Sequence, residues 1–325
     1  MNLLELRDLK TYFNTGGHVV RAVDGIDLVV ERGKTEGLVG ESGCGKTVTA
    51  LSIMGLVPYP GKTVGGEILL EGENLLHKSP RQMAKIRGRK ISMVFQEPLS
   101  CLNPVLRVGR QIEEAIRLHQ GLESQEARAK AVEMLERVGI PSPRTRARDY
   151  PHQLSGGMRQ RVMIAMALSC HPSLLLADEP TTALDVTIQA QILELLRELT
   201  RELETALLLI THDFGIVARL CDRISVMYAG KIVEQAPARR IFKEPRHPYT
   251  RGLLQAIPRI DRAIHRLESI NGVIPNLADL PGGCPFHPRC AVHEAICHRE
   301  YPPAVQVDAD HRVSCWKHVP GGGGH

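Results

Sequence analysis

No run of apolar residues in this 325-residue chain approaches the roughly eighteen that a membrane-spanning helix needs. The first eight residues, MNLLELRD, also lack the long apolar core of a secretory signal. We therefore expect a chain that is soluble by itself and reaches a membrane only through a partner. The formal net charge is only +5, which gives little support for binding to nucleic acid or to anionic lipid.

The chain also lacks internal repeats, and its only low-complexity segment is the terminal run at 321–325. A hydrophobic fraction of 43% permits a sizeable core. A length of 325 residues allows one large domain and a smaller one.

The clearest motif is the segment GESGCGKT at residues 40–47, a full match to the phosphate-binding pattern GxxxxGK[ST]. It follows an apolar strand candidate at 37–39 and precedes a helix candidate at 48–54, which is the context this loop requires. Lys46 is predicted to bridge the β- and γ-phosphates of ATP, and the Thr47 hydroxyl to coordinate magnesium. The predicted nucleotide contacts in the loop are Gly40, Ser42, Gly43, Cys44, Gly45, Lys46, Thr47 and Val48.

Two apolar runs without polar alternation, 173–177 and 206–210, are typical of strands buried on both faces of a parallel sheet. The first run ends at Asp178 and Glu179, and ligands bind at the carboxyl ends of such strands. Asp178 is predicted to hold the magnesium shell, and Glu179 to act as general base on the water that attacks the γ-phosphate. The second run ends at His212, for which we predict a γ-phosphate contact.

A second anion-binding element is predicted in LSGGMRQR at 154–161, because Ser155, Gly156 and Gly157 begin an amphipathic stretch. An ordinary serine cap on a helix is the alternative for the tripeptide alone. With the motifs above, this segment makes residues 1 to about 240 resemble the ATP-binding subunit of an ABC transporter. In that family the serine and glycines read the γ-phosphate of the ATP held by the opposite subunit, which implies that two chains close around each nucleotide.

The resemblance implies further roles. Phe13 falls where the family places an aromatic ring against adenine, with Tyr12 as second choice. Gln96 matches the glutamine that touches magnesium and the attacking water and links the site to the membrane subunit. Asp185 matches the D-loop, and His212 the switch histidine.

The resemblance also implies an α/β fold, a P-loop NTPase (RecA-like) core with an antiparallel β-subdomain and a helical subdomain. Short alternating segments before residue 95 suit the β-subdomain, and helical periodicity suits the helical subdomain at about 97–160. An apolar stripe from Ile188 to Leu203 predicts another helix. We expect a nucleotide-binding domain at 1–240 and a small, cysteine-rich C-terminal extension at 241–325.

The segment PRHPYT at 245–250 resembles the His-Pro-Tyr motif of the oligopeptide/dipeptide branch of ABC importers. The match is closest to the dipeptide-type "D" ATPase subunit, which implies a heterodimer with a related ATPase subunit. The implied function is peptide import through two membrane permease subunits fed by an extracytoplasmic substrate-binding protein, with this chain peripheral on the cytoplasmic face of the cell membrane. Nickel, glutathione or another cargo is the alternative within the branch.

Four of the eight cysteines, Cys284, Cys290, Cys297 and Cys315, lie in the C-terminal extension. In a cytosolic chain such clustering favours a metal over disulfides. The spacings of five, six and seventeen residues differ from the CxxC pairs of zinc ribbons. Four thiolates suit zinc or an iron–sulfur cluster, and free buried thiols remain a third interpretation. The branch resemblance favours a 4Fe-4S cluster over zinc.

Two rival classes are disfavoured. A soluble ABC ATPase of DNA repair or translation would need a long coiled-coil insertion or a second ATPase domain, whereas only about sixty residues separate Gln96 from Ser155. A regulatory or scaffold protein with a vestigial site is disfavoured because every predicted catalytic position is intact.

Overall fold

The computed structural model describes residues 1–97, 101–182, 184–256 and 270–320 of the chain. These residues divide into two compact units. The helical unit comprises Met1–Leu3, Val30–Lys34 and His77–Leu209, and the sheet unit comprises Leu4–Val29, Thr35–Leu76 and Ile210–His325. None of the helices in the described part of the chain combines the length and the apolar character of a membrane-spanning segment.

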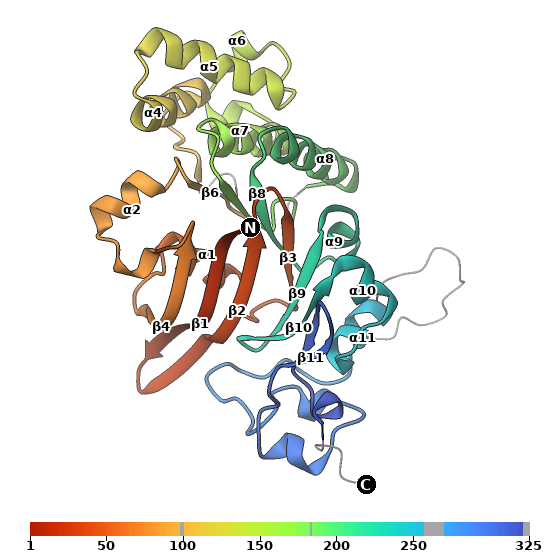
Figure 1. The fold of residues 1–325 in the computed structure, drawn as a ribbon. Coiled ribbons are helices and arrows are strands. Elements are labelled where there is room, and N and C mark those ends of the chain that lie inside the picture. The colour runs from red at the N-terminus through yellow and green to blue at the C-terminus, as the bar shows by residue number, and fades with distance from the viewer. Residues whose placement is uncertain (98–100, 183, 257–269, 321–325) are drawn as a thin grey trace. The chain divides into compact units, whose positions relative to one another are not determined.

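The helical unit has three neighbouring strands in the order β8-β7-β6, with helices before and between them in the chain (Figure 1). Its elements are α2 (Pro80–Ile86), β6 (Ile91–Val94), α4 (Val108–Gln120), α5 (Ser124–Arg137), α6 (Pro143–Arg146), α7 (Gly156–Leu168), β7 (Leu174–Asp178), α8 (Val186–Glu202) and β8 (Ala206–Thr211), whose last two residues belong to the sheet unit.

The helices predicted from apolar periodicity are confirmed. Helix α4 buries Ile112 and Ile116, and α5 buries Ala127, Ala131 and Leu135 on the side where it packs against α4 and α7. The apolar stripe after residue 188 lies on α8, as expected. The helices α4, α5 and α6 form a group of their own at the top of Figure 1.

The predicted buried strands are also confirmed. Every residue of β7 and of β8 is buried, which explains why neither strand alternates polar with apolar side chains. Strand β7 pairs in parallel with β6, so Asp178 lies at the carboxyl edge of this part of the sheet.

The sheet unit contains two groups of strands. One is a four-stranded sheet in the order β2-β1-β4-β5, and the other has the order β11-β12-β10-β9-β3. The elements are β1 (Asn2–Thr15), β2 (His18–Glu31), β3 (Thr35–Val39), α1 (Lys46–Met54), β4 (Gly61–Leu70), β5 (Glu73–Asn74), α9 (Phe214–Leu220), β9 (Arg223–Tyr228), β10 (Lys231–Pro237), α10 (Ala238–Lys243), α11 (Pro248–Gln255), β11 (Val305–Asp308) and β12 (His311–Val313).

The sequence did not predict that the C-terminal extension would add strands to this unit. Strand β12 pairs antiparallel with β10 through Val313 and Arg312, and β11 pairs with β12 (Figure 1). Both strands are short and polar on one side, so alternation gives only a weak signal.

An aromatic cluster attaches the extension to the core of the sheet unit. The rings of Tyr228, Tyr249 and Phe286 pack with centroids 4.6 to 5.3 Å apart, and all three side chains are buried. Tyr228 ends β9, Tyr249 lies in α11, and Phe286 belongs to the cysteine-rich segment. The extension therefore shares a hydrophobic core with strand β9.

Candidate nucleotide-binding site

The phosphate loop in the sheet unit requires its glycines. A Cβ on Gly40 would collide with the carbonyl oxygen of Met227, and one on Gly45 with the carbonyl oxygen of Ala22. Gly45 also has a φ of 111°, which strains any other residue, and it is the residue immediately before α1. The N-terminus of α1 therefore lies at the loop, where its N–H groups can bind an anion.

Lys46, the first residue of α1, lies inside this loop. Its side chain is 5% exposed, and Nζ donates to the carbonyl oxygens of Gly40 at 2.8 Å and Glu41 at 2.9 Å. The ammonium group is therefore held by backbone carbonyls of the same loop that the motif predicts to bind the phosphates.

Cys44 packs beneath the loop with its side chain 1% exposed. Burial raises the pKa of its thiol. Its carbonyl oxygen accepts a hydrogen bond from Gly230 N at 2.9 Å, so this residue joins the loop to the turn between β9 and β10. Cys44 therefore contributes packing and a backbone hydrogen bond to the loop.

The structure separates the two aromatic candidates near the end of β1. Tyr12 donates its hydroxyl to Asp24 Oδ1 at 2.6 Å, and burial together with this carboxylate raises the pKa of Tyr12 to about 12. Phe13 is half-buried, and its ring contacts the backbone position of Gly61 in the paired strand β4. The Tyr12 hydroxyl therefore has a partner within the sheet unit, and the assignment of adenine stacking to Phe13 stays a prediction.

In the helical unit the carboxylates predicted to act on magnesium and water follow each other at the end of β7. Asp178 is 3% exposed. Glu179 has a φ of 45°, a left-handed conformation that is uncommon for a residue other than glycine. Its Oε2 atom accepts from Gln96 Nε2 at 3.2 Å and from Thr182 Oγ1 at 3.0 Å. The structure thus brings Gln96 and Glu179 together, and Thr182 is a contact that the sequence did not reveal.

The serine-glycine segment and Asp185 begin helices at exposed positions of this unit. Ser155 Oγ accepts from Met158 N at 3.3 Å as the cap of α7, and Asp185 Oδ1 accepts from Ile188 N at 3.0 Å as the cap of α8. Gly156 and Ser155 are exposed. Ser155 therefore does cap α7, as the alternative interpretation of the tripeptide expects, and the N-terminus of α7 is still accessible to solvent.

His212, assigned to the sheet unit, follows β8 directly and is exposed. The next residue, Asp213, caps α9 by accepting from Gly215 N at 2.7 Å. The cap fixes the turn that carries the histidine.

The four cysteines of the extension surround one small cavity of about 20 Å³, which Phe286, Pro248 and Trp316 also line. All eight cysteines of the chain are free thiols. Burial raises the pKa of Cys284 to about 12 and raises those of Cys290 and Cys315. Among the described residues, however, no set of three or more histidine, cysteine or acidic side chains has the geometry to hold a metal ion. The four-cysteine metal site therefore stays a prediction.

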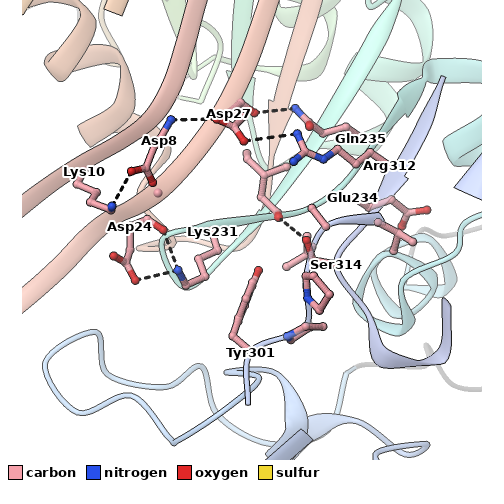
Figure 2. A pocket seen from close by; sticks show the side chains of 17 residues that line it. Asp8, Lys10, Asp24, Asp27, Lys231, Glu234, Gln235, Tyr301, Arg312 and Ser314 are labelled. Carbon is pink, nitrogen blue, oxygen red and sulfur yellow. Dashed lines mark hydrogen bonds and ion pairs between the residues drawn. The ribbon is translucent and has the colours of Figure 1, made fainter. Parts of the chain in front are cut away.

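A separate polar pocket of about 420 Å³ lies where strands β1, β2 and β10 meet the extension (Figure 2). Lys231 Nζ pairs with Asp24 Oδ2 at 2.9 Å, and Lys10 Nζ with Asp8 Oδ2 at 2.7 Å. The extension is joined to the four-stranded sheet here by Arg312, whose Nη1 atom lies 3.4 Å from Asp27 Oδ2.

The phosphate loop and the paired carboxylates after a buried parallel strand define an ATPase of the P-loop class. The sequence matches the ABC transporter family over residues 23–182 and the oligopeptide/dipeptide transporter C-terminal region over residues 233–297. The chain belongs to the ABC transporter family and is its ATP-hydrolysing subunit.

Curated relatives match over nearly the whole chain. A probable peptide ABC transporter ATP-binding protein of Sinorhizobium fredii is 50% identical over 97% of this chain and 95% of its own length. The dipeptide transport ATP-binding protein DppD of Bacillus subtilis is 49% identical over 97% and 94%. Among solved structures, the dimeric ATP-binding cassette MJ0796 bound to ADP and phosphate has a TM-score of 0.66 at 28% identity, covering 73% of this chain and 99% of that one.

Proposed function

We propose that this chain binds and hydrolyses ATP to drive the uptake of dipeptides and oligopeptides across the cytoplasmic membrane. The observation that carries the cargo assignment is the match of residues 233–297 to the oligopeptide/dipeptide transporter C-terminal region, next to an intact set of ATPase motifs. Relatives named as peptide or dipeptide transport ATP-binding proteins support the same cargo. The nucleotide-binding domain is then residues 1–240 and the extension residues 241–325.

Glu179 acts in this proposal as general base, and Gln96 holds its carboxylate. The hydrogen bond from Gln96 Nε2 orients the Oε2 atom of Glu179. The left-handed backbone conformation of Glu179 is energetically unfavourable, and such strained residues are typical of functional sites. Lys46 binds the β- and γ-phosphates, and His212 contacts the γ-phosphate. Magnesium, held by Thr47, Asp178 and Gln96, would neutralise phosphate charge when bound.

The second half of each site comes from another ATPase subunit in this proposal. Ser155, Gly156 and Gly157 offer a hydroxyl and unobstructed N–H groups at an exposed helix start, which suits the γ-phosphate of an ATP bound by a partner. Asp185, also exposed, faces the same partner, and Phe13 stacks on adenine. We expect the partner to be a related chain rather than a second copy.

The membrane permease subunits dock, in this proposal, on a pocket of about 700 Å³ in the helical unit. Five arginines line the pocket: Arg107, Arg110, Arg128, Arg144 and Arg148. Val105, at its rim, is 75% exposed. An acidic helix with an apolar tip in a permease loop fits this surface. Docking there holds the chain at the cytoplasmic face of the membrane, and a substrate-binding protein acts through the permease.

The four cysteines of the extension would hold a 4Fe-4S cluster, with zinc as the alternative. Their convergence on one cavity supports a shared ligand, and an all-thiolate donor set suits the cluster. When bound, the group would cross-link the extension.

The assembled transporter in proteoliposomes tests the function. We expect ATP-dependent accumulation of a labelled dipeptide, abolished when Glu179 is replaced by Gln. Accumulation of nickel or glutathione in place of peptides would keep the ATPase and overturn the cargo. ATP hydrolysis without any permease-dependent uptake would overturn the transport role.

A further inference from the structure

Arg289 of the C-terminal extension forms an ion pair with Glu41 of the phosphate loop. Its Nη1 atom lies 2.7 Å from Glu41 Oε2, and its Nη2 atom 2.9 Å from Glu41 Oε1. The two side chains are 4% and 22% exposed, so water screens the pair little. A bidentate, charge-assisted contact of this kind is among the strong hydrogen bonds of proteins, and the bond to Glu41 raises the pKa of Arg289 further.

The guanidinium group is itself held in place. It lies over the ring of Tyr228 at 5.8 Å, and Nε donates to the carbonyl oxygen of Asn271 at 3.2 Å. One face of the guanidinium group and the N–H groups of Nε, Nη1 and Nη2 all have partners, so Arg289 is held in place and is not a mobile surface charge.

Glu41 is held by its other polar groups as well. Its backbone N donates to the hydroxyl of Tyr249 at 2.9 Å, and its carbonyl oxygen accepts from Lys46 Nζ at 2.9 Å. The histidine and proline of the His-Pro-Tyr motif place Tyr249, because His247 Nδ1 accepts from Tyr249 N and Pro248 begins α11. Two of these three contacts on Glu41 thus come from residues beyond 240.

ATP binding should affect only one of the three contacts of Glu41 directly, the one with Lys46. Lys46 is the phosphate ligand of the motif, so phosphate competes with the carbonyl of Glu41 for its ammonium. Arg289 and Tyr249 make contacts for which phosphate does not compete. They can keep the loop in shape when Lys46 turns to the nucleotide.

We propose that Arg289 is a positioning residue for ATP binding, and that the C-terminal extension thereby forms part of the nucleotide site. By fixing Glu41, Arg289 holds the loop in one conformation before ATP binds. Less conformational entropy is then lost when ATP binds. The proposal rests on the ATPase activity of the family and on neither the cargo nor the cysteine site.

The experiment is a double-mutant cycle in the full-length chain. The variants are Arg289→Met, Glu41→Gln and the two combined, with Arg240→Met as matched control. Arg240 lies in α10, directly before the extension, and its Nη1 atom pairs with Oδ2 of Asp308 in the extension at 2.8 Å. Affinity for a fluorescent ATP analogue is measured for the chain, and KM and kcat for ATP in the assembled transporter.

We expect Arg289→Met to raise the Kd and KM for ATP about tenfold. This assumes that part of the free energy of the lost charged hydrogen bonds had contributed to ATP affinity. The kcat at saturating ATP should stay within about twofold, since no reacting group is touched. Glu41→Gln should resemble it, and the double variant should be no worse than either single one, because both remove the same contact. Arg240→Met should bind ATP like the wild type.

Three outcomes would overturn the proposal: unchanged ATP affinity in folded Arg289→Met, strictly additive effects in the double variant, or an equal loss in Arg240→Met. If Arg289→Met does not fold by circular dichroism, Arg289→Lys replaces it. Lysine keeps the charge and loses the fork, so a rise of about threefold in Kd is expected, and wild-type affinity there would equally reject the proposal. A failure to import peptide leaves these readouts unaffected.

Discussion

The side-chain amide of Gln96 donates to the carboxylate of Glu179, with 3.2 Å between Nε2 and Oε2. Gln96 follows strand β6 and Glu179 follows the parallel neighbour β7, so strand pairing brings together residues 83 positions apart in the chain. The contact engages the Oε2 atom of Glu179. It gives the proposed general base a fixed orientation, which proton transfer requires.

Replacing Glu179 by Gln should therefore stop turnover while leaving ATP binding intact. General-base catalysis contributes about 10²- to 10⁴-fold, so we expect kcat to fall roughly a thousandfold. ATP should then hold the ATPase dimer closed, which size-exclusion chromatography with labelled ATP can detect. Thr182→Ala, which removes a hydroxyl 3.0 Å from the same oxygen, is the milder comparison, with a loss of about tenfold. Unimpaired hydrolysis in Glu179→Gln would remove this residue as the base.

Lys46→Ala should lose ATP binding, because its ammonium group lies in the loop, against the carbonyls of Gly40 and Glu41, where the motif places the phosphates. We expect Kd for ATP to rise at least about a hundredfold, the loss of a charged phosphate contact. Cys44→Ser is the matched control from the same loop, and it should bind ATP normally since the cysteine contributes packing and backbone. Normal ATP affinity in Lys46→Ala would contradict the phosphate-loop assignment.

The local elements of the ATPase core could be predicted because their signals are short-range. The loop motif, the unalternating strands β7 and β8 and the apolar stripe of α8 each follow from residues adjacent in sequence. The contact between Thr182 and Glu179 had no such signal, because it depends on the turn that the left-handed Glu179 begins.

The role of the extension was the larger omission. Arg289 and Glu41 are 248 positions apart, and a single arginine beside a cysteine carries no pattern. The sequence located the His-Pro-Tyr motif but not its physical purpose, which is to cap α11 and present the Tyr249 hydroxyl to Glu41. Such long-range polar pairs become visible only in three dimensions.

Phe286→Ala should loosen the extension from the core. Phe286 is 4% exposed and packs against Tyr228 and Tyr249 with ring centroids 5.3 Å away from each. Removing a buried aromatic ring leaves a cavity, and we expect a loss of about 3 kcal/mol in the free energy of unfolding. Chemical denaturation measures this loss, with Phe286→Leu as a milder control. Equal stability of the Ala variant and the wild type would show that the cluster does not attach the extension.

Cys290→Ser should lower the iron and acid-labile sulfide content of the purified chain. The matched control is Cys170→Ser, at a cysteine outside the extension whose thiol lies near the carbonyl of Ala115. Its iron content should equal that of the wild type. Stoichiometric zinc without iron in the wild type would reverse the order of the two metals. Neither metal in freshly prepared protein would mean that the four cysteines are free, half-buried thiols.

The last prediction concerns Glu234, a carboxylate of β10 that is 1% exposed. It accepts from Arg246 N at 2.6 Å, His247 N at 3.0 Å and His311 Nε2 at 2.7 Å. These bonds tie the segment before α11 and the strand β12 to β10. Burial alone would raise the pKa of Glu234, but the hydrogen bonds outweigh it and hold the pKa below its ordinary value of 4.5.

A depressed pKa in the folded state means that the unfolded chain takes up the proton first as the pH falls. The stability that ionised Glu234 contributes is therefore complete above about pH 4.5 and is lost as the pH falls through the folded value. Glu234→Gln should cost roughly 2 kcal/mol at pH 7, because the amide accepts fewer of these bonds.

Thermal unfolding of both proteins from pH 7 to pH 3.5 measures the difference. The gap in Tm between wild type and Glu234→Gln should be constant down to about pH 5 and shrink below it, since the other carboxylates are common to both proteins and cancel. A gap that stays constant to the lowest pH would show that the pKa of Glu234 is the same in the folded and the unfolded chain. A gap that widens as the pH falls would show that folding raises this pKa, and either result would contradict the prediction.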